Sequence, residues 1–421
     1  MEKVTKIMAE TARIIVGPLF VFSGFVKSID PLGTAYKIGD YLHSFHLDVF
    51  SFLALPGSIL LSAIELFIGL LLLMGMYRKF STLLALLFMS FMTIVTFYLA
   101  IANPISDCGC FGDALILTNW ETFWKNIFLL ACTICLVKFY KRLTHLVAKK
   151  HALFTLFVCA LYPIILSLYC YGWGLPLIDF LPYKIGNTIS PEAPAQTAAN
   201  EIAFETTLIY EKEGVRKEFT IDNYPADDLS WTFIDAITVE KGGSLAHHAE
   251  QFILFDNERE DVTLPVLTAP EYTFLLISRN LKRANESTVD LINSISDYAA
   301  EHQYHFYGVT ASSNSDIEKW GENTGSEYPF LKADETLLKS IIRSNPGLLL
   351  VKEGKIVYKW SSRQIPDEKF FNKPLDEIAF EKIAKRKKYG RLFIAFALLA
   401  LPLGTAMAQK NAYEKKQNNS N

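Results

Sequence analysis

The chain has 421 residues, of which 51% are hydrophobic and 20% charged, and its net charge is about −3. This composition is too apolar for one ordinary soluble domain and offers no basic patch for nucleic acid. The sequence also lacks a phosphate loop, zinc-ligand spacing and a serine-nucleophile elbow. The pair His247-His248 is interpreted as an exposed loop, so no metal site is predicted.

Five apolar runs of roughly 17 to 25 residues are long enough to cross ~30 Å of hydrocarbon at ~1.5 Å per residue. They lie at residues 12–28, 52–76, 81–102, 122–140 and 152–173. A shorter sixth run, 392–408, predicts a C-terminal transmembrane helix. The first run lacks a small-residue cleavage site, which favours a retained span over a signal peptide. The sequence therefore predicts an integral membrane protein.

Lysine and arginine in the short loops predict the orientation, because cationic segments resist translocation. Residues 138–150 are basic, whereas the loop 103–121 contains neither lysine nor arginine. We therefore expect a bacterial inner-membrane protein with a cytoplasmic N-terminus, whose cysteine loop and residues 174–390 are periplasmic. The basic segment 385–391 disagrees with this rule, although long domains translocate largely regardless of charge.

From about residue 174 the pattern changes to short β-rich segments separated by turns. Residues 189–200 are rich in Pro, Ala and Thr and predict a linker. Residues 204–221 are β-branched on both sides of a Glu-Gly turn, which indicates a hairpin, and residues 231–239 predict a further strand. This region is predicted to be small and β-rich.

A strand, a helix, a strand, a helical stretch and an antiparallel hairpin led by proline are predicted next. They occupy residues 272–278, 286–302, 305–310, 315–325 and 345–360. This order resembles a thioredoxin-like α/β fold, and Asn345-Pro346 resembles the cis-proline that such folds place beside their active site. The resemblance implies peptide or partner binding at Asn345 and Pro346.

Redox-active thioredoxin-like proteins carry Cys-x-x-Cys after the first strand of this unit, where the present chain reads "SRNLKRANES". No cysteine follows Cys170 anywhere in the sequence. This domain therefore cannot perform thiol chemistry with its own residues. It either binds a partner or packs on the membrane part.

The predicted fold class is mixed, with an α-helical membrane bundle and an extracytoplasmic α/β thioredoxin-like domain. The chain divides into a four-helix membrane domain, a fifth transmembrane helix, a linker with a small β-rich region, the thioredoxin-like domain, and a C-terminal transmembrane helix with a cytoplasmic tail. These parts cover residues 1–150, 151–174, 175–263, 264–384 and 385–421.

The membrane part resembles a known family in residues 13–41, in residues 63–79 and in the stretch "DCGCFG" at 107–112. These segments resemble the DoxX-like superfamily and, within it, the MauE-like membrane proteins of methylamine utilisation. The whole chain resembles a Bacteroidetes family that joins such a four-helix unit to a periplasmic thioredoxin-like domain. MauE-like proteins are implicated in maturing periplasmic partners that need disulfides, so the resemblance implies oxidative or maturation work on envelope proteins.

Cys108 and Cys110 stand one residue apart in the predicted periplasmic loop. Gly109 supplies the backbone freedom that a small disulfide ring needs, and strained, exposed disulfides are the more oxidising ones. Redox exchange, a structural disulfide and ligation of a metal or another group remain open. The flanking Asp107 and Asp113 are expected to disfavour thiolate formation.

Cys132 and Cys135 lie on one side of the fourth span, at helical spacing. We interpret them as packing residues. The alternative is electron transfer to quinone, as in membrane thiol oxidoreductases that resemble vitamin K epoxide reductase.

Glu65 falls near the middle of the second span. An ionised carboxylate there would mark a proton, ion or ligand site, and the alternative is a neutral, hydrogen-bonded acid that holds the helices together. Three further ionisable residues near the outer helix ends either snorkel to the interface or surround the cysteine loop. They are Lys27, Asp30 and Lys125.

We therefore expect a membrane protein that supports thiol-disulfide chemistry or maturation of envelope proteins. In this hypothesis Cys108 and Cys110 are the exchanging pair, Glu65 is a proton site and a membrane quinone accepts the electrons. The alternative is a non-catalytic scaffold whose thioredoxin-like domain binds a periplasmic partner. Whether the protein is an enzyme depends on which hypothesis holds.

Overall fold

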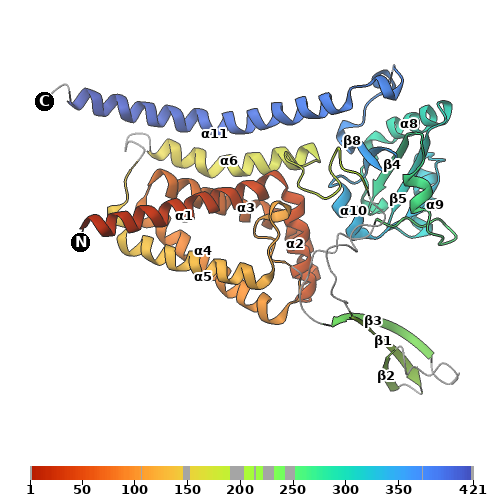
Figure 1. The fold of residues 1–421 in the computed structure, drawn as a ribbon, viewed down its shortest axis with the longest axis horizontal. Helices are drawn as coiled ribbons and strands as arrows, with labels where there is room; N and C mark the ends of the chain where they lie inside the picture. Colours follow the sequence, from red (N-terminus) through yellow and green to blue (C-terminus); the bar gives the residue numbers. More distant parts are fainter. Residues whose placement is uncertain are drawn as a thin grey trace. The chain divides into compact units, whose positions relative to one another are not determined.

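The computed structural model describes residues 2–105, 107–145, 152–189, 203–212, 215–220, 232–241, 252–371 and 373–418. The chain forms two compact units (Figure 1). One comprises Met1–Pro191 together with Phe252–Asn421, and the other comprises Glu192–Gln251.

Among the described residues, five helices are long and apolar enough to cross a membrane, which confirms the five predicted spans. They are α1 (Glu2–Ile29), α3 (Ala54–Met74), α4 (Arg78–Ala102), α5 (Asn119–Phe139) and α6 (Ala152–Trp173). Their outward faces are apolar: Phe91, Ile94, Leu153 and Phe157 are each more than 60% exposed. Such a surface is suited to contact with lipid.

Helices α1 and α3 pack closely at Gly24. A Cβ atom at this position would lie only 2.4 Å from the backbone nitrogen of Leu66, so a larger residue would push the helices apart. Small residues permit this kind of close packing in membrane bundles. This close packing brings Ser23 and Lys27 of α1 into contact with Glu65, the neighbour of Leu66 on α3.

A shorter helix, α2 (Pro31–Ser44), follows α1 directly. Pro31 occupies the first turn, and the Asp30 carboxylate accepts a hydrogen bond from the Gly33 amide at 3.0 Å. Proline and an aspartate cap are typical of helix starts because the first amides lack intrahelical partners. Asp30 thus has a structural role at the junction of the two helices.

The α/β domain contains one five-stranded sheet of order β6-β5-β4-β7-β8. Strands β4, β5 and β6 are mutually parallel, while β7 runs antiparallel to β4 and to β8. The elements are α7 (Thr263–Leu267), β4 (Thr273–Ser278), α8 (Val289–Glu301), β5 (His305–Thr310), α9 (Asn314–Thr324), β6 (Phe330–Lys332), α10 (Glu335–Ile341), β7 (Gly347–Lys352) and β8 (Lys355–Ser361). This order confirms the thioredoxin-like expectation.

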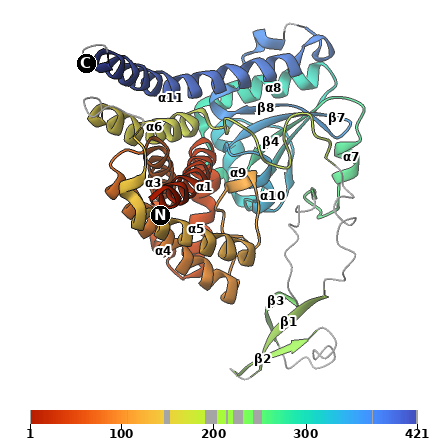
Figure 2. The ribbon, with the colours of Figure 1, turned by 60° about the vertical axis from the view of Figure 1, so that its left-hand side comes forward.

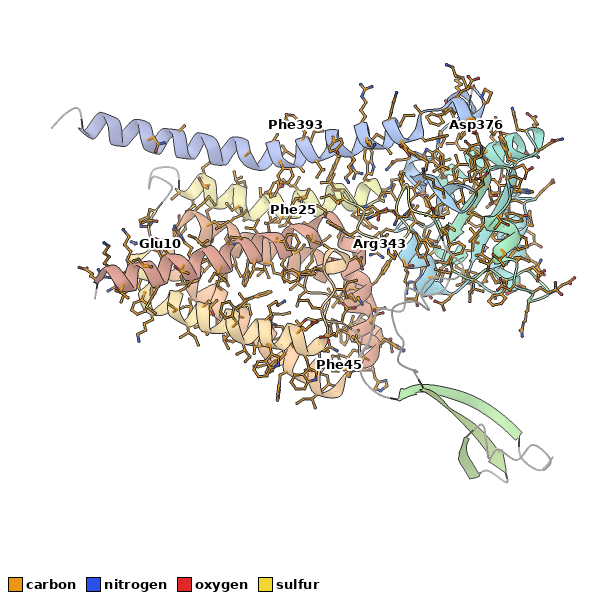
Figure 3. The ribbon with its side chains drawn as sticks, in the orientation of Figure 1. Glu10, Phe25, Phe45, Arg343, Asp376 and Phe393 are labelled. Carbon is orange, nitrogen blue, oxygen red and sulfur yellow. The ribbon has the colours of Figure 1, made fainter. Side chains whose placement is uncertain are left out.

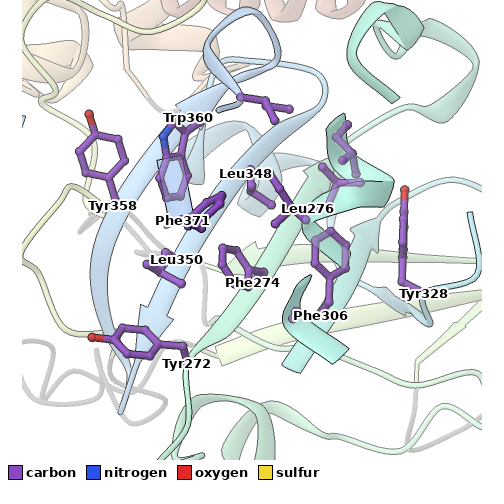
Figure 4. Packing of buried hydrophobic residues seen from close by; sticks show 14 of the residues in the cluster. Tyr272, Phe274, Leu276, Phe306, Tyr328, Leu348, Leu350, Tyr358, Trp360 and Phe371 are labelled. Carbon is purple, nitrogen blue, oxygen red and sulfur yellow. The ribbon is translucent and has the colours of Figure 1, made fainter. Parts of the chain in front are cut away.

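Strand β4 is buried along its whole length, as expected for a central strand covered on both faces. Phe274 and Leu276 pack into the cluster drawn in Figure 4. Leu275 and Ile277 point to the opposite face and join a second cluster. The period of two along the strand thus supplies two hydrophobic cores.

The predicted hairpin after the proline is present. The Asn345-Pro346 peptide bond is cis. The turn between β7 and β8 consists of Glu353 and Gly354, both with positive φ, which is the backbone conformation of a type I′ hairpin turn.

The second unit contains β1 (Ala203–Lys212), β2 (Val215–Thr220) and β3 (Thr232–Lys241) in an antiparallel sheet of order β2-β1-β3. These strands confirm the predicted hairpin and the strand after it. After Ile189, the predicted Pro/Ala/Thr linker lies outside the described residues, as does the pair His247-His248.

The sixth apolar run lies within the long helix α11 (Phe380–Asn418). Figures 1 and 2 show α11 running beside α6. The Tyr162 hydroxyl on α6 donates to the Ala395 carbonyl at 3.0 Å, and Phe396 stacks on Phe25 of α1 at 5.6 Å between ring centroids. These contacts join α11 to the bundle, and its full crossing of the membrane stays a prediction.

Candidate functional site

The two cysteines of the loop between α4 and α5 lie side by side. Their Sγ atoms are 3.1 Å apart, and both are free thiols. Gly109 between them has a φ of +65°, a left-handed conformation that glycine adopts at little cost. The Gly112 amide donates to the Gly109 carbonyl at 3.0 Å and closes the turn. The sequence Cys-Gly-Cys therefore forms a compact dithiol.

Helix α2 holds this loop in place. Asp107 accepts a hydrogen bond from the Gly109 amide at 2.8 Å and forms an ion pair with Lys37 at 2.6 Å. The Tyr41 hydroxyl donates to the Cys108 carbonyl at 3.1 Å. Sequence reasoning missed Lys37 and Tyr41, because nothing in the pattern indicates that α2 folds back over the loop.

The two thiols differ in acidity. The hydrogen bond from Cys108 lowers the pKa of Cys110 to about 6, with burial opposing the shift and Lys125 and Lys27 assisting it. The same hydrogen bond, together with burial, raises the pKa of Cys108 well above its usual value. Since the thiolate is the nucleophile in thiol exchange, Cys110 is the more reactive of the two.

Both flanking aspartates lie in ion pairs: Asp107 pairs with Lys37, and Asp113 pairs with Arg343. That these aspartates disfavour a thiolate stays a prediction.

A buried polar cluster lies against the loop. Lys27 and Glu65 are 2% and 3% exposed, and the Lys27 ammonium contacts both carboxylate oxygens at 2.6 and 2.8 Å. The Ser23 hydroxyl is 2.6 Å from Glu65 Oε2 and 2.6 Å from the Cys110 carbonyl. The snorkelling interpretation of Lys27 is thus wrong, because its ammonium turns inward. A lysine and a glutamate in neighbouring spans are the signal that could have revealed the pair.

The Ser23 hydroxyl has two possible acceptors. A hydroxyl carries one hydrogen, so it donates at any moment either to Glu65 or to the Cys110 carbonyl. Ser23 thus links the carboxyl group of the buried Lys27–Glu65 pair to the backbone of the cysteine loop.

A small cavity of about 40 Å³ opens beside Cys110 among α1, α3, α4 and α5. Its polar lining includes Ser23, Glu65, Lys125 and Asn126, and apolar side chains form the rest. The Lys125 ammonium lies 4.3 Å from the Phe111 ring centroid and forms no ion pair within the described part of the chain. The cavity thus offers a donor for an uncharged acceptor group.

One residue of the α/β domain reaches this region. Arg343, which Figure 3 labels, is 5% exposed. It contacts Asp30 Oδ2 from Nε at 2.9 Å and pairs with Asp113. Its guanidinium carbon lies 5.4 Å from the Tyr36 ring centroid. Burial alone would lower the pKa of Arg343, but the attraction of both carboxylates raises it. The segment before the cis-proline is therefore fastened to the cysteine loop, which sequence reasoning did not foresee.

Asn345 and Pro346 lie just beyond this arginine. The Asn345 side chain accepts from the Ser278 hydroxyl at 2.9 Å and donates to the Asn280 carbonyl at 2.8 Å, and Pro346 is buried. Neutral polar groups thus occupy the end of β4, where related folds carry thiols. Partner binding at Asn345 and Pro346 stays a prediction.

The remaining cysteines lie within helices. Cys132 and Cys135 on α5 are half-buried and pack against the cluster shared by α1, α4 and α5, without a hydrogen bond to each other within the described residues. Cys159 and Cys170 on α6 are buried. These placements favour the packing interpretation of Cys132 and Cys135.

Comparison with known proteins identifies the membrane part. Residues 5–139 match the family model described as methylamine utilisation protein MauE, so this part of the chain is MauE-like. Residues 204–241 match a domain of unknown function, DUF8463. No curated protein sequence matches the chain.

Among solved structures, the chain is similar to a candidate protein disulfide isomerase from Bacteroides thetaiotaomicron. The identity is 16%, the match covers 34% of this chain and 90% of that one, and the TM-score is 0.24. The strand order described above, and not this likeness, identifies the α/β fold.

Proposed function

We propose that the MauE-like membrane part is a thiol-disulfide oxidoreductase of the cell envelope, with Cys108 and Cys110 as the exchanging pair. The observation that carries the proposal is the 3.1 Å separation of the two sulfur atoms next to the buried Lys27–Glu65 ion pair. A dithiol of unequal acidity, with one low-pKa member, is suited to exchange by attack and resolution. The MauE-like match supports a role in the maturation of envelope proteins.

The proposed substrate is a partner protein with two thiols. The Cys108–Cys110 disulfide accepts two electrons, the partner's sulfurs form a disulfide, and both loop cysteines become thiols. We place this partner on the side of the membrane that is predicted to be periplasmic, because the cysteine loop carries no lysine or arginine.

The proposed electron acceptor is a membrane quinone, which takes up two electrons and two protons and leaves as a quinol. Both thiols give up their hydrogens, and one sulfur–sulfur bond forms between Cys108 and Cys110. The chemistry of the residues around Cys110 supports this assignment, because apolar side chains and the Lys125 ammonium, a hydrogen-bond donor, line the small cavity beside it.

The chain's residues have separate roles in this scheme. When the partner's thiolate attacks the disulfide at Cys108, Cys110 is the leaving thiolate, because the hydrogen bond from Cys108 lowers its pKa. The partner's second thiol then releases Cys108. Glu65 receives a proton through Ser23, and Lys27 balances the buried charge of the carboxylate.

Quinone reduction by the purified full-length protein tests the proposal. After reduction of the protein and removal of the reductant, added decylubiquinone should lose its oxidised absorbance in a 1:1 ratio with the dithiol. Cys108→Ser and Cys110→Ser should each abolish this reaction. The double variant Cys132→Ser/Cys135→Ser is the matched control and should keep it.

Two results would contradict the proposal. If the Cys110→Ser variant still reduced quinone, electrons would leave by another route. If the wild-type protein neither reduced quinone nor exchanged with a dithiol protein, the scaffold hypothesis would replace this one.

A further inference from the structure

The basic segment 385–391, which disagrees with the charge rule for membrane orientation, borders a large hollow. The hollow has a volume of about 390 Å³ and lies among the C-terminal end of α6, strand β8 and the first turns of α11. Six basic side chains line it, and they are Lys184, Lys359, Lys385, Lys387, Lys388 and Arg391.

The positive charge of this hollow is not balanced by its own carboxylates. Only two acidic residues, Asp179 and Glu381, belong to the described lining. Asp179 already pairs with Lys359 at 3.2 Å, and Glu381 pairs with Lys355 at 3.4 Å. Within the residues that the structure describes, Lys385 and Lys388 form no ion pair. The hollow therefore attracts an anion.

Burial disfavours the charged form of two of these lysines. It lowers the pKa of Lys359, which Asp179 partly restores, and it lowers the pKa of Lys387 with help from Arg391. A bound anion would favour the charged form of both lysines.

The hollow is also positioned at the end of a membrane span. Trp173 is the last residue of α6, and the Arg391 guanidinium lies 4.6 Å from its ring centroid. Tryptophan and tyrosine are enriched at the level of the lipid headgroups. Leu175 and Leu177 add apolar lining next to the basic side chains.

We propose that this hollow binds the phosphate headgroup of an anionic membrane lipid. Phosphate is the chemistry that lysine and arginine recognise, and the apolar and aromatic lining favours a lipid over a soluble phosphate. The lysines of segment 385–391 then have a binding function on the side of the membrane that is predicted to be periplasmic. The site is separate from the dithiol and does not depend on the proposed redox activity.

Native mass spectrometry of the full-length protein in detergent tests the proposal. Phosphatidylglycerol is titrated against the wild type, with phosphatidylcholine as the zwitterionic comparison. Lys385→Gln/Lys388→Gln removes two lining charges. The matched control Lys382→Gln/Arg386→Gln removes two charges of the same helix segment that do not line the hollow.

We expect the lining variant to bind phosphatidylglycerol about thirtyfold more weakly, since each of the two basic residues near a lipid surface contributes on the order of 1 kcal/mol. The control should bind as the wild type does, and phosphatidylcholine should bind weakly to all three. Equal loss in the two variants, or equal binding of the two lipids, would overturn the proposal. Displacement of the lipid by millimolar inorganic phosphate would assign the site to a soluble phosphate instead.

Discussion

The helical bundle and the α/β domain differ in the side chains that they place where thiol exchange could occur. In the bundle, the cysteine loop sits on a buried ion pair between Lys27 and Glu65, and its two thiols touch. In the α/β domain, the end of β4 faces the cis-proline with neutral side chains, Ser278 and Asn345, that hydrogen-bond to each other. The fold commonly associated with thiol exchange therefore lacks thiols here, while the membrane part holds a dithiol.

The two parts of the molecule thus contribute different groups to the region around the cysteine loop. The α/β domain contributes Arg343, a charge that fastens it to Asp30 and Asp113 beside the cysteine loop. The bundle contributes the ionisable groups and the cavity next to Cys110. Fold resemblance alone would assign a redox role to the α/β domain, whereas the cysteines lie in the membrane part.

The largest effect is expected from breaking the buried ion pair of the bundle. Lys27→Met leaves Glu65 without its cation, and removing one partner of a buried pair costs about 3–5 kcal/mol. Thermal unfolding in detergent should show this loss, whereas Lys27→Met/Glu65→Leu should recover a large part of it. Lys125→Met is the control and should melt close to the wild type. A double variant no more stable than Lys27→Met would contradict the pairing.

The next effect concerns the attachment of the α/β domain. Arg343→Gln leaves Asp30 and Asp113 facing each other without a cation, and we expect a loss of about 2–3 kcal/mol because the Asp113 side chain is partly exposed. Hydrogen exchange in residues 107–113 should rise. The exposed Arg283→Gln serves as the control. Unchanged exchange in the Arg343 variant would show that the domain does not restrain the cysteine loop.

The next effect, about tenfold in rate, is expected when the alkylation of Cys110 is followed as a function of pH. Because the pKa of Cys110 is lowered to about 6, its reaction with iodoacetamide should fall only when the pH drops below about 6. An ordinary thiol loses reactivity below about pH 8.5. Cys108→Ala removes the main cause of the lowering and should move the midpoint upward, which peptide mass spectrometry can follow. A midpoint near 8.5 in the wild type would refute the assignment of Cys110.

The smallest effect is expected from the neutral end of β4. Asn345→Ala removes the hydrogen bonds to Ser278 and Asn280 and should cost about 1 kcal/mol of stability. Ser278→Ala should cost less in this background than alone, because the two side chains share a bond. Quinone reduction should be unchanged in both variants. A loss of that reaction would place part of the chemistry in the α/β domain.

Local patterns explain why much of the fold could be predicted. Apolar runs long enough for a bilayer gave the five spans, since each run forms its helix without help from distant residues. The strands of the α/β domain followed from β-branched segments with turn signals, as at Glu353-Gly354. Helix α2 was missed because its short pattern lies between a span and a loop.

The site was predictable only in part. Cys108, Cys110 and Glu65 stand out by residue type and position, but their grouping depends on the packing of α1 on α3 at Gly24. Arg343 is distant in sequence from Asp30 and Asp113, and no local pattern reports such a contact.

The redox state of Cys108 and Cys110 in intact cells shows whether this pair exchanges electrons. A membrane-impermeant thiol reagent should label the pair only after mild reduction, and stopping respiration should shift the pair from partly oxidised toward reduced. A pair that stayed fully oxidised under every respiratory condition, with a double serine variant that lost stability but not partner maturation, would contradict the account and favour a structural disulfide in a scaffold.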